Sequence, residues 1–125
     1  MKDFIYFKNK NKPSRTLNER FIVIPKNIDN KAELFDFFSK KFEFPFYFGE
    51  NWDALYDCLT DLSWINEKKI TIVHEDIPMK STEEKKKYIE LLLDVLNEFS
   101  KNKTLVIAIK FPESCKKEIE ILKNM

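Results

Sequence analysis

The apolar residues of the chain recur at two different spacings, which divide it into strands and helices. Short runs rich in β-branched or aromatic residues indicate strands, and longer stretches with apolar residues three or four positions apart indicate helices. The sequence predicts strands at residues 4–7, 20–25, 69–73 and 105–109, and helices at residues 31–42, 51–62 and 81–100, with a short further helix after Pro112 that uses Ile119 and Leu122.

The order of these elements determines the fold class. Two helices lie between the second and third predicted strands, and one helix lies between the third and fourth. Helical connections of this kind join parallel strands. We therefore predict an α/β fold in which helices pack against a small sheet of three or four mainly parallel strands. The uninterrupted apolar run Leu105–Ile109 is typical of a strand that is buried on both faces.

The expected helix starts carry capping residues. Asp29 or Asn30 can cap the first helix, and Asn51 can cap the second. Ser81 and Glu84 match the capping box and open the third helix.

Composition narrows the class of protein. The single glycine, Gly49, excludes glycine-rich nucleotide-binding loops, and we expect it to adopt a backbone conformation that other residues avoid. Two cysteines, Cys58 and Cys115, are too few for a disulfide framework. The apolar run at the N-terminus is too short for a signal peptide or a membrane span. We therefore expect one domain, residues 1–125, in the cytoplasm, with free thiols and no membrane contact.

Charge is unevenly distributed along the chain, although its 22 basic and 21 acidic residues nearly balance. No lysine or arginine lies between Lys41 and Lys68, and this window holds six carboxylates, for a formal charge of −6. Because the whole chain carries +1, the remainder carries +7. An electrostatic function would therefore reside in a local patch rather than in the field of the whole molecule.

The predicted second helix lies within this window and separates apolar from acidic side chains. At about 100° per residue, Asp53, Asp57 and Thr60 lie opposite the apolar side, with Tyr56 at the flank. Asp57 is four residues from both Asp53 and Asp61, a spacing at which like charges destabilise a helix by about 0.2–0.5 kcal/mol per pair. Such an acidic face is either a solvated surface without a specific role or a binding surface for a cationic partner.

The segment FPFYFGENWDALYDCLTDL, residues 44–62, resembles the signature of the barstar family of ribonuclease inhibitors. The strongest part runs from Tyr47 to Leu55 and from Asp57 to Thr60. The order of elements agrees over about residues 20–110, which implies a barstar-like core with terminal additions. The resemblance also implies an intracellular inhibitor, and not an enzyme, that acts as the immunity protein to a bacterial ribonuclease toxin by blocking its active site.

The resemblance places the partner contacts on the acidic helix and on the loop before it. Carried over by position, Asp57 would be the central mimic of an RNA phosphate, with Asp53 as a second carboxylate beside it. Tyr47 would pack on the nuclease, Thr60 would hydrogen-bond at the rim, and Tyr56 stands where the family prototype has tryptophan. The expected partner-binding residues are Tyr47, Gly49, Glu50, Asn51, Asp53, Tyr56, Asp57, Thr60 and Asp61.

The sequence departs from the family pattern at points that bear on the partner. The prototype is strongly acidic, whereas this chain is nearly neutral, and Leu62 replaces an aromatic residue. An acidic contact from the last long helix of the prototype aligns here with either Asn97 or Glu98. We expect the partner to be a basic, extracellular-type ribonuclease or a related toxin, and the free protein to be a monomer. The alternative is a barstar-fold immunity or regulatory protein for a partner that is not a ribonuclease.

Catalytic and metal-binding functions fit the sequence less well. The only histidine, His74, follows a strand, and Cys58 faces the core, where a thiol is usually inert. Glu50, Asp53 and Asp57 match no calcium loop. We therefore expect no catalytic residue, metal or cofactor. Lysines scattered over several short segments also disfavour direct binding to nucleic acid.

Overall fold

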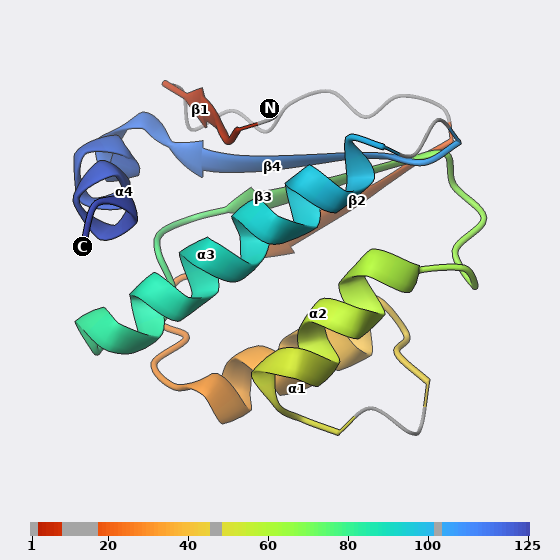
Figure 1. Ribbon diagram of the computed structural model, residues 1–125, viewed down its shortest axis with the longest axis horizontal. Coiled ribbons are helices and arrows are strands. Elements are labelled where there is room, and N and C mark those ends of the chain that lie inside the picture. Colours follow the sequence, from red (N-terminus) through yellow and green to blue (C-terminus); the bar gives the residue numbers. More distant parts are fainter. Residues whose placement is uncertain (1–2, 9–17, 46–48, 102–103) are drawn as a thin grey trace.

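The computed structural model describes residues 3–8, 18–45, 49–101 and 104–125, and in it helices pack against one sheet (Figure 1). The strands are β1 (Ile5–Phe7), β2 (Glu19–Ile24), β3 (Lys69–His74) and β4 (Val106–Pro112). The helices are α1 (Lys31–Lys41), α2 (Trp52–Asp61), α3 (Thr82–Phe99) and α4 (Lys116–Lys123), with a 3-10 turn η1 (Glu113–Cys115) before α4. The predicted α/β class is confirmed, and the predicted elements form close to their expected positions.

The sheet has the strand order β1-β4-β3-β2, and every neighbouring pair is parallel. Ile22 of β2 pairs with Ile72 of β3, which in turn pairs with Ile109 of β4. Because paired residues project to the same face of a sheet, these isoleucines form one apolar layer. β1 lies at the other edge, where Tyr6 pairs with Phe111.

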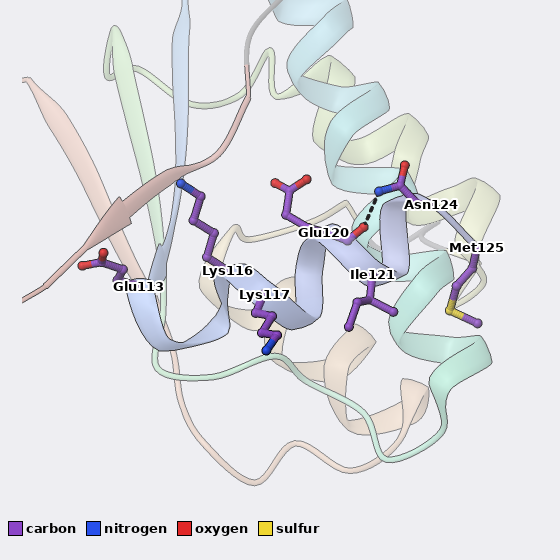
Figure 2. A pocket seen from close by; sticks show the side chains of 7 residues that line it. All are labelled: Glu113, Lys116, Lys117, Glu120, Ile121, Asn124 and Met125. Carbon is purple, nitrogen blue, oxygen red and sulfur yellow. Dashed lines mark hydrogen bonds between the residues drawn. The ribbon is translucent and has the colours of Figure 1, made fainter.

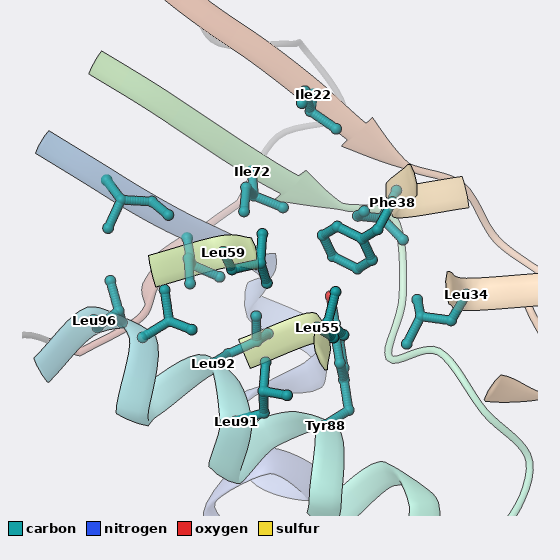
Figure 3. Packing of buried hydrophobic residues seen from close by; sticks show 14 of the residues in the cluster. Ile22, Leu34, Phe38, Leu55, Leu59, Ile72, Tyr88, Leu91, Leu92 and Leu96 are labelled. Carbon is teal, nitrogen blue, oxygen red and sulfur yellow. The ribbon is translucent and has the colours of Figure 1, made fainter. Parts of the chain in front are cut away.

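Helices α1, α2 and α3 bury their apolar sides against this layer (Figure 3). Each fully buried side chain of this size contributes about 1.5–3 kcal/mol relative to an exposed one. The helix residues that are at most 1% exposed in this core include Leu34, Phe38, Leu55, Leu59, Tyr88, Leu92 and Leu96.

The prediction that Leu105–Ile109 is buried on both faces is wrong. Burial alternates along β4, and Val106 is 43% exposed while Ala108 is only partly buried. The helices that form the core lie against the other face of this strand, so apolar residues of β4 that point away from them remain accessible. The strand buried at successive positions is instead β3, where Ile70–His74 are all buried.

His74, at the end of β3, is part of the core. It is 0% exposed, its Nδ1 lies 3.0 Å from the carbonyl oxygen of Lys110, and its Nε2 lies 2.5 Å from the Tyr88 hydroxyl. Its ring also stacks on Phe111 at 3.9 Å between centroids. Burial lowers the pKa of His74 from 6.5 to about 3, because the charged imidazolium would lose its water. The neutral ring therefore donates to the carbonyl and accepts from the tyrosine.

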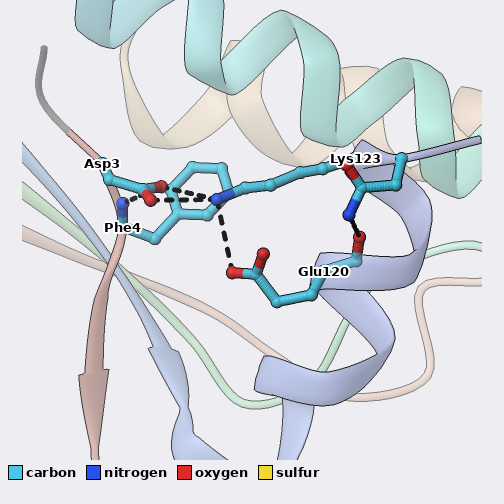
Figure 4. Close-up of polar contacts among 5 residues, drawn as sticks. Asp3, Phe4, Glu120 and Lys123 are labelled. Carbon is cyan, nitrogen blue, oxygen red and sulfur yellow. Dashed lines mark hydrogen bonds and ion pairs between the residues drawn. The ribbon is translucent and has the colours of Figure 1, made fainter.

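The two ends of the chain pack together in what we call the terminal clamp, residues 3–7 and 116–123 (Figure 4). The Lys123 ammonium lies 2.9 Å from each carboxylate oxygen of Asp3. It also lies 5.5 Å from the centre of the Phe4 ring, which is itself buried. The clamp thus ties β1 to α4 by an ion pair over an aromatic ring.

Candidate functional site

Helix α2 turns its leucines and Cys58 into the core and its carboxylates toward solvent. The predicted division of this helix into an apolar and an acidic side is confirmed. We call the four exposed carboxylates of this segment the acidic ridge: Glu50, Asp53, Asp57 and Asp61.

The ridge carboxylates have no ion-pair partner among the residues that the structure describes. Asp53, Asp57 and Asp61 follow one another at four-residue spacing, so each neighbouring pair repels. Asp61 also lies in the last turn of α2, where the helix dipole disfavours a negative charge and no basic residue is present. The ridge therefore lowers the stability of its own helix.

The start of α2 is held by Asn51, as predicted. Its Oδ1 accepts a hydrogen bond of 2.8 Å from the backbone N–H of Ala54, and its Nδ2 donates to the carbonyl oxygen of Gly49 at 3.3 Å. This N-cap fixes the first turn and with it the direction in which Asp53 projects.

The expectation that Gly49 adopts a conformation closed to other residues is wrong. No glycine has a positive φ, and the left-handed residue here is Glu50, with φ 52°. The reason for glycine is instead space, because a Cβ at position 49 would lie 3.2 Å from Nδ2 of Asn51. A side chain there would press on the residue that caps α2.

Tyr56 and Thr60 flank the ridge. Burial raises the pKa of the Tyr56 hydroxyl, and the negative charges of Glu98, Asp94 and Asp57 raise it further. The phenol therefore stays protonated at neutral pH and is available as a hydrogen-bond donor. The Thr60 hydroxyl donates to the carbonyl oxygen of Tyr56 at 2.8 Å, so its oxygen remains available as an acceptor.

Helix α3 extends the acidic surface, a contribution that sequence analysis did not anticipate beyond Asn97 or Glu98. Between α2 and α3 lies a shallow hollow, lined from α2 by Trp52, Asp53 and Tyr56, and from α3 by Lys87, Glu90, Leu91 and Asp94. Glu98 lies near enough to Tyr56 for its negative charge to raise the pKa of that hydroxyl. The available signal was the four-residue spacing of Glu90, Asp94 and Glu98, which places them on one side of α3.

The remaining expected contact residues precede α2 in the chain. Gly49, Glu50 and Asn51 are exposed immediately before α2. Tyr47 lies outside the described residues. Eight of the nine expected positions therefore lie within residues 49–61, and the ninth lies outside the described residues.

The groups that could support catalysis or metal binding have other roles. Both ring nitrogens of His74 are engaged within the core. Cys58 is buried, and burial followed by the charges of Asp57 and Asp61 raises the pKa of its thiol, which disfavours the nucleophilic thiolate. Across residues 3–8, 18–45, 49–101 and 104–125, no three His, Cys, Asp or Glu side chains are grouped to hold a metal ion.

A second surface hollow lies along α4, away from the ridge (Figure 2). Exposed Ile121 and Met125 line it, together with positively charged lysines and negatively charged glutamates. It therefore lacks the single sign of charge that distinguishes the ridge.

None of the helices in the described residues is long and apolar enough to cross a membrane.

Comparison with known proteins bears on this acidic segment directly. The family model described as Barstar (barnase inhibitor) matches residues 19–111, which include α2 and all four ridge residues. A protein of Bacillus subtilis (strain 168) named "Putative ribonuclease inhibitor YrdF" is 33% identical over 63 residues. That match covers 50% of this chain and 66% of the relative, so the chain spans just under two thirds of that protein. With the parallel sheet, the capped acidic helix and a family match over most of its length, the chain belongs to the barstar family.

Proposed function

We propose that this protein inhibits a ribonuclease by docking its acidic ridge in the active-site groove of the enzyme. The observation that carries the proposal is a row of exposed carboxylates, on a helix anchored in the core, with no cation of the described chain paired to it. Family membership supports the same role. The proposed partner is a basic, extracellular-type ribonuclease or a related toxin.

Carboxylates suit this task because a ribonuclease groove presents arginine, lysine and histidine to the phosphates of RNA. Charge-assisted hydrogen bonds between such groups are about twice as strong as neutral ones, and arginine can bind a carboxylate through two parallel bonds. A helix packed on the core loses little freedom on binding, which keeps the cost of association low. Opposite fields also accelerate encounter, and this matters for capturing a toxic enzyme.

Each ridge residue has a proposed role that follows from its place on α2. Asp57, one turn into the helix, takes the central phosphate position, and Asp53 takes the neighbouring one. Tyr56 offers an aromatic edge and a hydroxyl donor, and Thr60 offers an acceptor at the rim. Glu98 of α3, whose charge already reaches Tyr56, is the proposed acidic contact from the long helix.

The same surface argues against an RNA-binding role. Phosphates of a nucleic acid would be repelled by Asp53, Asp57 and Asp61, and the neighbouring Glu90 and Asp94 of α3 add to that repulsion. The partner that the ridge would attract is a protein with a positively charged surface.

The test is a titration of ribonuclease activity. A panel of basic secreted bacterial ribonucleases is first assayed with the wild-type protein, and the inhibited enzyme is then titrated with Asp57→Ala and Asp53→Ala. Removing one partner of a desolvated charge pair costs about 2–5 kcal/mol, so each variant should inhibit roughly 30- to 5,000-fold more weakly. Glu113→Ala is the matched control, because Glu113 is also exposed and unpaired among the described residues but lies after β4.

Circular dichroism would establish that the variants remain folded, since each replaces an exposed side chain. Inhibition should be the same with and without EDTA, because the proposed contacts are direct. Equal potency of wild type and Asp57→Ala would remove the phosphate-mimic role. Binding to a cationic protein without inhibition of RNA cleavage would instead favour a barstar-fold protein with a different kind of partner.

A further inference from the structure

The two tryptophans of the chain join α1 to α2 at opposite ends of α2. At the start of α2, the Trp52 ring lies edge-on to the Phe35 ring of α1, with 5.2 Å between the centroids. After the end of α2, Nε1 of Trp64 donates to the carbonyl oxygen of Phe42 at 2.8 Å, and Phe42 is the residue at which α1 ends. This second contact closes the stretch of chain that contains all the expected partner-binding residues.

The end of α1 explains why the Phe42 carbonyl needs this donor. Phe42 is 0% exposed, and the carbonyl oxygens at the end of a helix have no donor within the helix. The chain leaves α1 through a Schellman turn, in which Glu43 has a φ of 55° and the N–H of Phe44 donates to the carbonyl oxygen of Ser39 at 2.9 Å. That turn serves the Ser39 carbonyl and leaves the Phe42 carbonyl to Trp64. Because a buried carbonyl without a donor is costly, the indole N–H is held at this point.

Trp64 is also fixed relative to α2. The helix ends at Leu62, which is 1% exposed, has a left-handed backbone and donates from its N–H to the carbonyl oxygen of Cys58 at 3.2 Å. The N–H of Ile65 in turn donates to the carbonyl oxygen of Leu62 at 3.0 Å, so a short turn carries Trp64. The Trp64 ring packs edge-on against the buried Phe44 ring, with 6.2 Å between the centroids. The indole therefore braces the end of α2 against the end of α1.

We propose that Trp64 is a positioning residue for the acidic ridge, because its indole N–H holds the end of α2, and with it Asp57 and Asp61, in the orientation that the partner binds. The inference rests on the proposed function and adds to it a residue that acts through the placement of others. The end of α2 needs such a brace, since its carboxylates repel one another and its last turn has no basic residue. A helix end that is already fixed loses less freedom on binding.

The test compares the full-length wild type with Trp64→Phe, which keeps an aromatic ring beside Phe44 but removes the donor to the Phe42 carbonyl. Against the ribonuclease that the wild type inhibits, the variant should be roughly three- to tenfold weaker, because a smaller fraction of the free protein presents the ridge in its binding orientation. Isothermal titration calorimetry should show a more unfavourable entropy of binding. Amide hydrogen exchange in the free variant should be faster at Leu62 and Phe44, on the two sides of the brace.

Tyr88→Phe is the matched control, because it also removes one aromatic donor and keeps the ring. The Tyr88 hydroxyl lies in the core, 2.5 Å from Nε2 of His74, and Tyr88 is 0% exposed. This variant should have a lower melting temperature, while its inhibition and its entropy of binding stay at the wild-type values.

The outcomes separate this inference from the function on which it rests. If Asp57→Ala weakens inhibition while Trp64→Phe inhibits as the wild type does, the positioning role is overturned and the inhibitor role stands. Equal weakening by Tyr88→Phe would assign the effect to general stability and would also overturn the positioning role. If the wild-type protein inhibits no ribonuclease, the proposed function fails, but exchange in the free protein still tests the brace. Faster exchange at Leu62 and Phe44 in Trp64→Phe supports it, and unchanged exchange overturns it.

Discussion

The acidic ridge and the terminal clamp are both built from charged side chains, but they treat charge in opposite ways. In the clamp, the Lys123 ammonium lies 2.9 Å from the Asp3 carboxylate, and Glu118 of the clamp pairs at the same distance with Lys85 of α3, which lies outside it. On the ridge, Asp53, Asp57 and Asp61 face solvent with no partner in the described chain.

The pKa of Asp3 records this difference. Burial alone would raise it, but the hydrogen bonds from Lys123 and from the backbone N–H of Phe4, with the positive charges of Lys123 and Lys116, lower it overall. Charges that hold the fold together are neutralised within it. A surface that leaves like charges together is therefore better explained by what it binds than by what it stabilises.

The largest contrast is expected from reversing one charge in each region. Asp57→Lys should weaken inhibition by about 1,000-fold or more, because an attraction of about 2–5 kcal/mol is replaced by repulsion from a cationic groove. Asp3→Lys should leave inhibition unchanged and lower only the melting temperature. Both are read from the same activity titration and thermal melt. Comparable loss of inhibition in the two variants would end the distinction between the regions.

Acid should destabilise the fold through its core. His74 has a pKa of 6.5 when unfolded and about 3 when folded, so the unfolded chain binds the extra proton between these values. Its stabilising effect is complete above pH 6.5 and is lost as the pH falls toward 3, at up to about 1.4 kcal/mol per pH unit. Denaturant unfolding of wild type and His74→Gln from pH 7 to pH 4 measures this slope. The variant should be less stable at pH 7 with a shallower dependence, and parallel curves would contradict the assignment.

A smaller effect is expected from breaking the clamp. Lys123→Ala removes the ion pairs to Asp3 and Glu120 and the cation–π contact to Phe4, each worth up to about 1 kcal/mol at a partly exposed site. The melting temperature should fall by a few degrees, less so in high salt, and inhibition should not change. Differential scanning calorimetry at two salt concentrations would measure both effects, and a salt-independent loss would show that packing rather than charge holds the clamp.

The smallest effect should come from relieving repulsion at the end of the ridge. Asp61→Lys removes one like-charge pair and places a cation in the last turn of α2, so stability should rise by about 0.5–1 kcal/mol. Inhibition should weaken at the same time. A variant that gained stability without losing inhibition would exclude Asp61 from the contact surface while leaving Asp57 in it.

The part of this comparison that sequence could predict is the part that depends on local periodicity. The spacing of Leu55, Cys58 and Leu59 fixes which side of α2 is buried, and hence which carboxylates are exposed. Asn51 was identifiable as a cap because its role involves only its immediate neighbours. The long match to the barstar signature supplied the family.

What sequence could not predict depends on distant neighbours. Asp3 and Lys123 are 120 residues apart, and nothing local indicates that they pair. The approach of Asp94 and Glu98 to Tyr56 follows from how α3 packs on α2. The apolar run of β4 predicts a strand buried on both faces, and this fails because periodicity does not reveal which face of the sheet the helices cover. The residue type at Gly49 cannot by itself distinguish close packing from a positive φ, because both favour glycine.

Docking of the ridge depends on its negative charge, and the salt dependence of inhibition measures the contribution of that charge most directly. The inhibition constant of wild type and of the double variant Asp53→Ala/Asp57→Ala would be determined at about 50 mM and about 500 mM salt, where screening lengths differ severalfold. We predict that wild-type inhibition weakens steeply with salt, and that the double variant is both weaker and much less sensitive. Equal salt dependence in the two proteins would contradict the claim that these carboxylates dock in the nuclease groove.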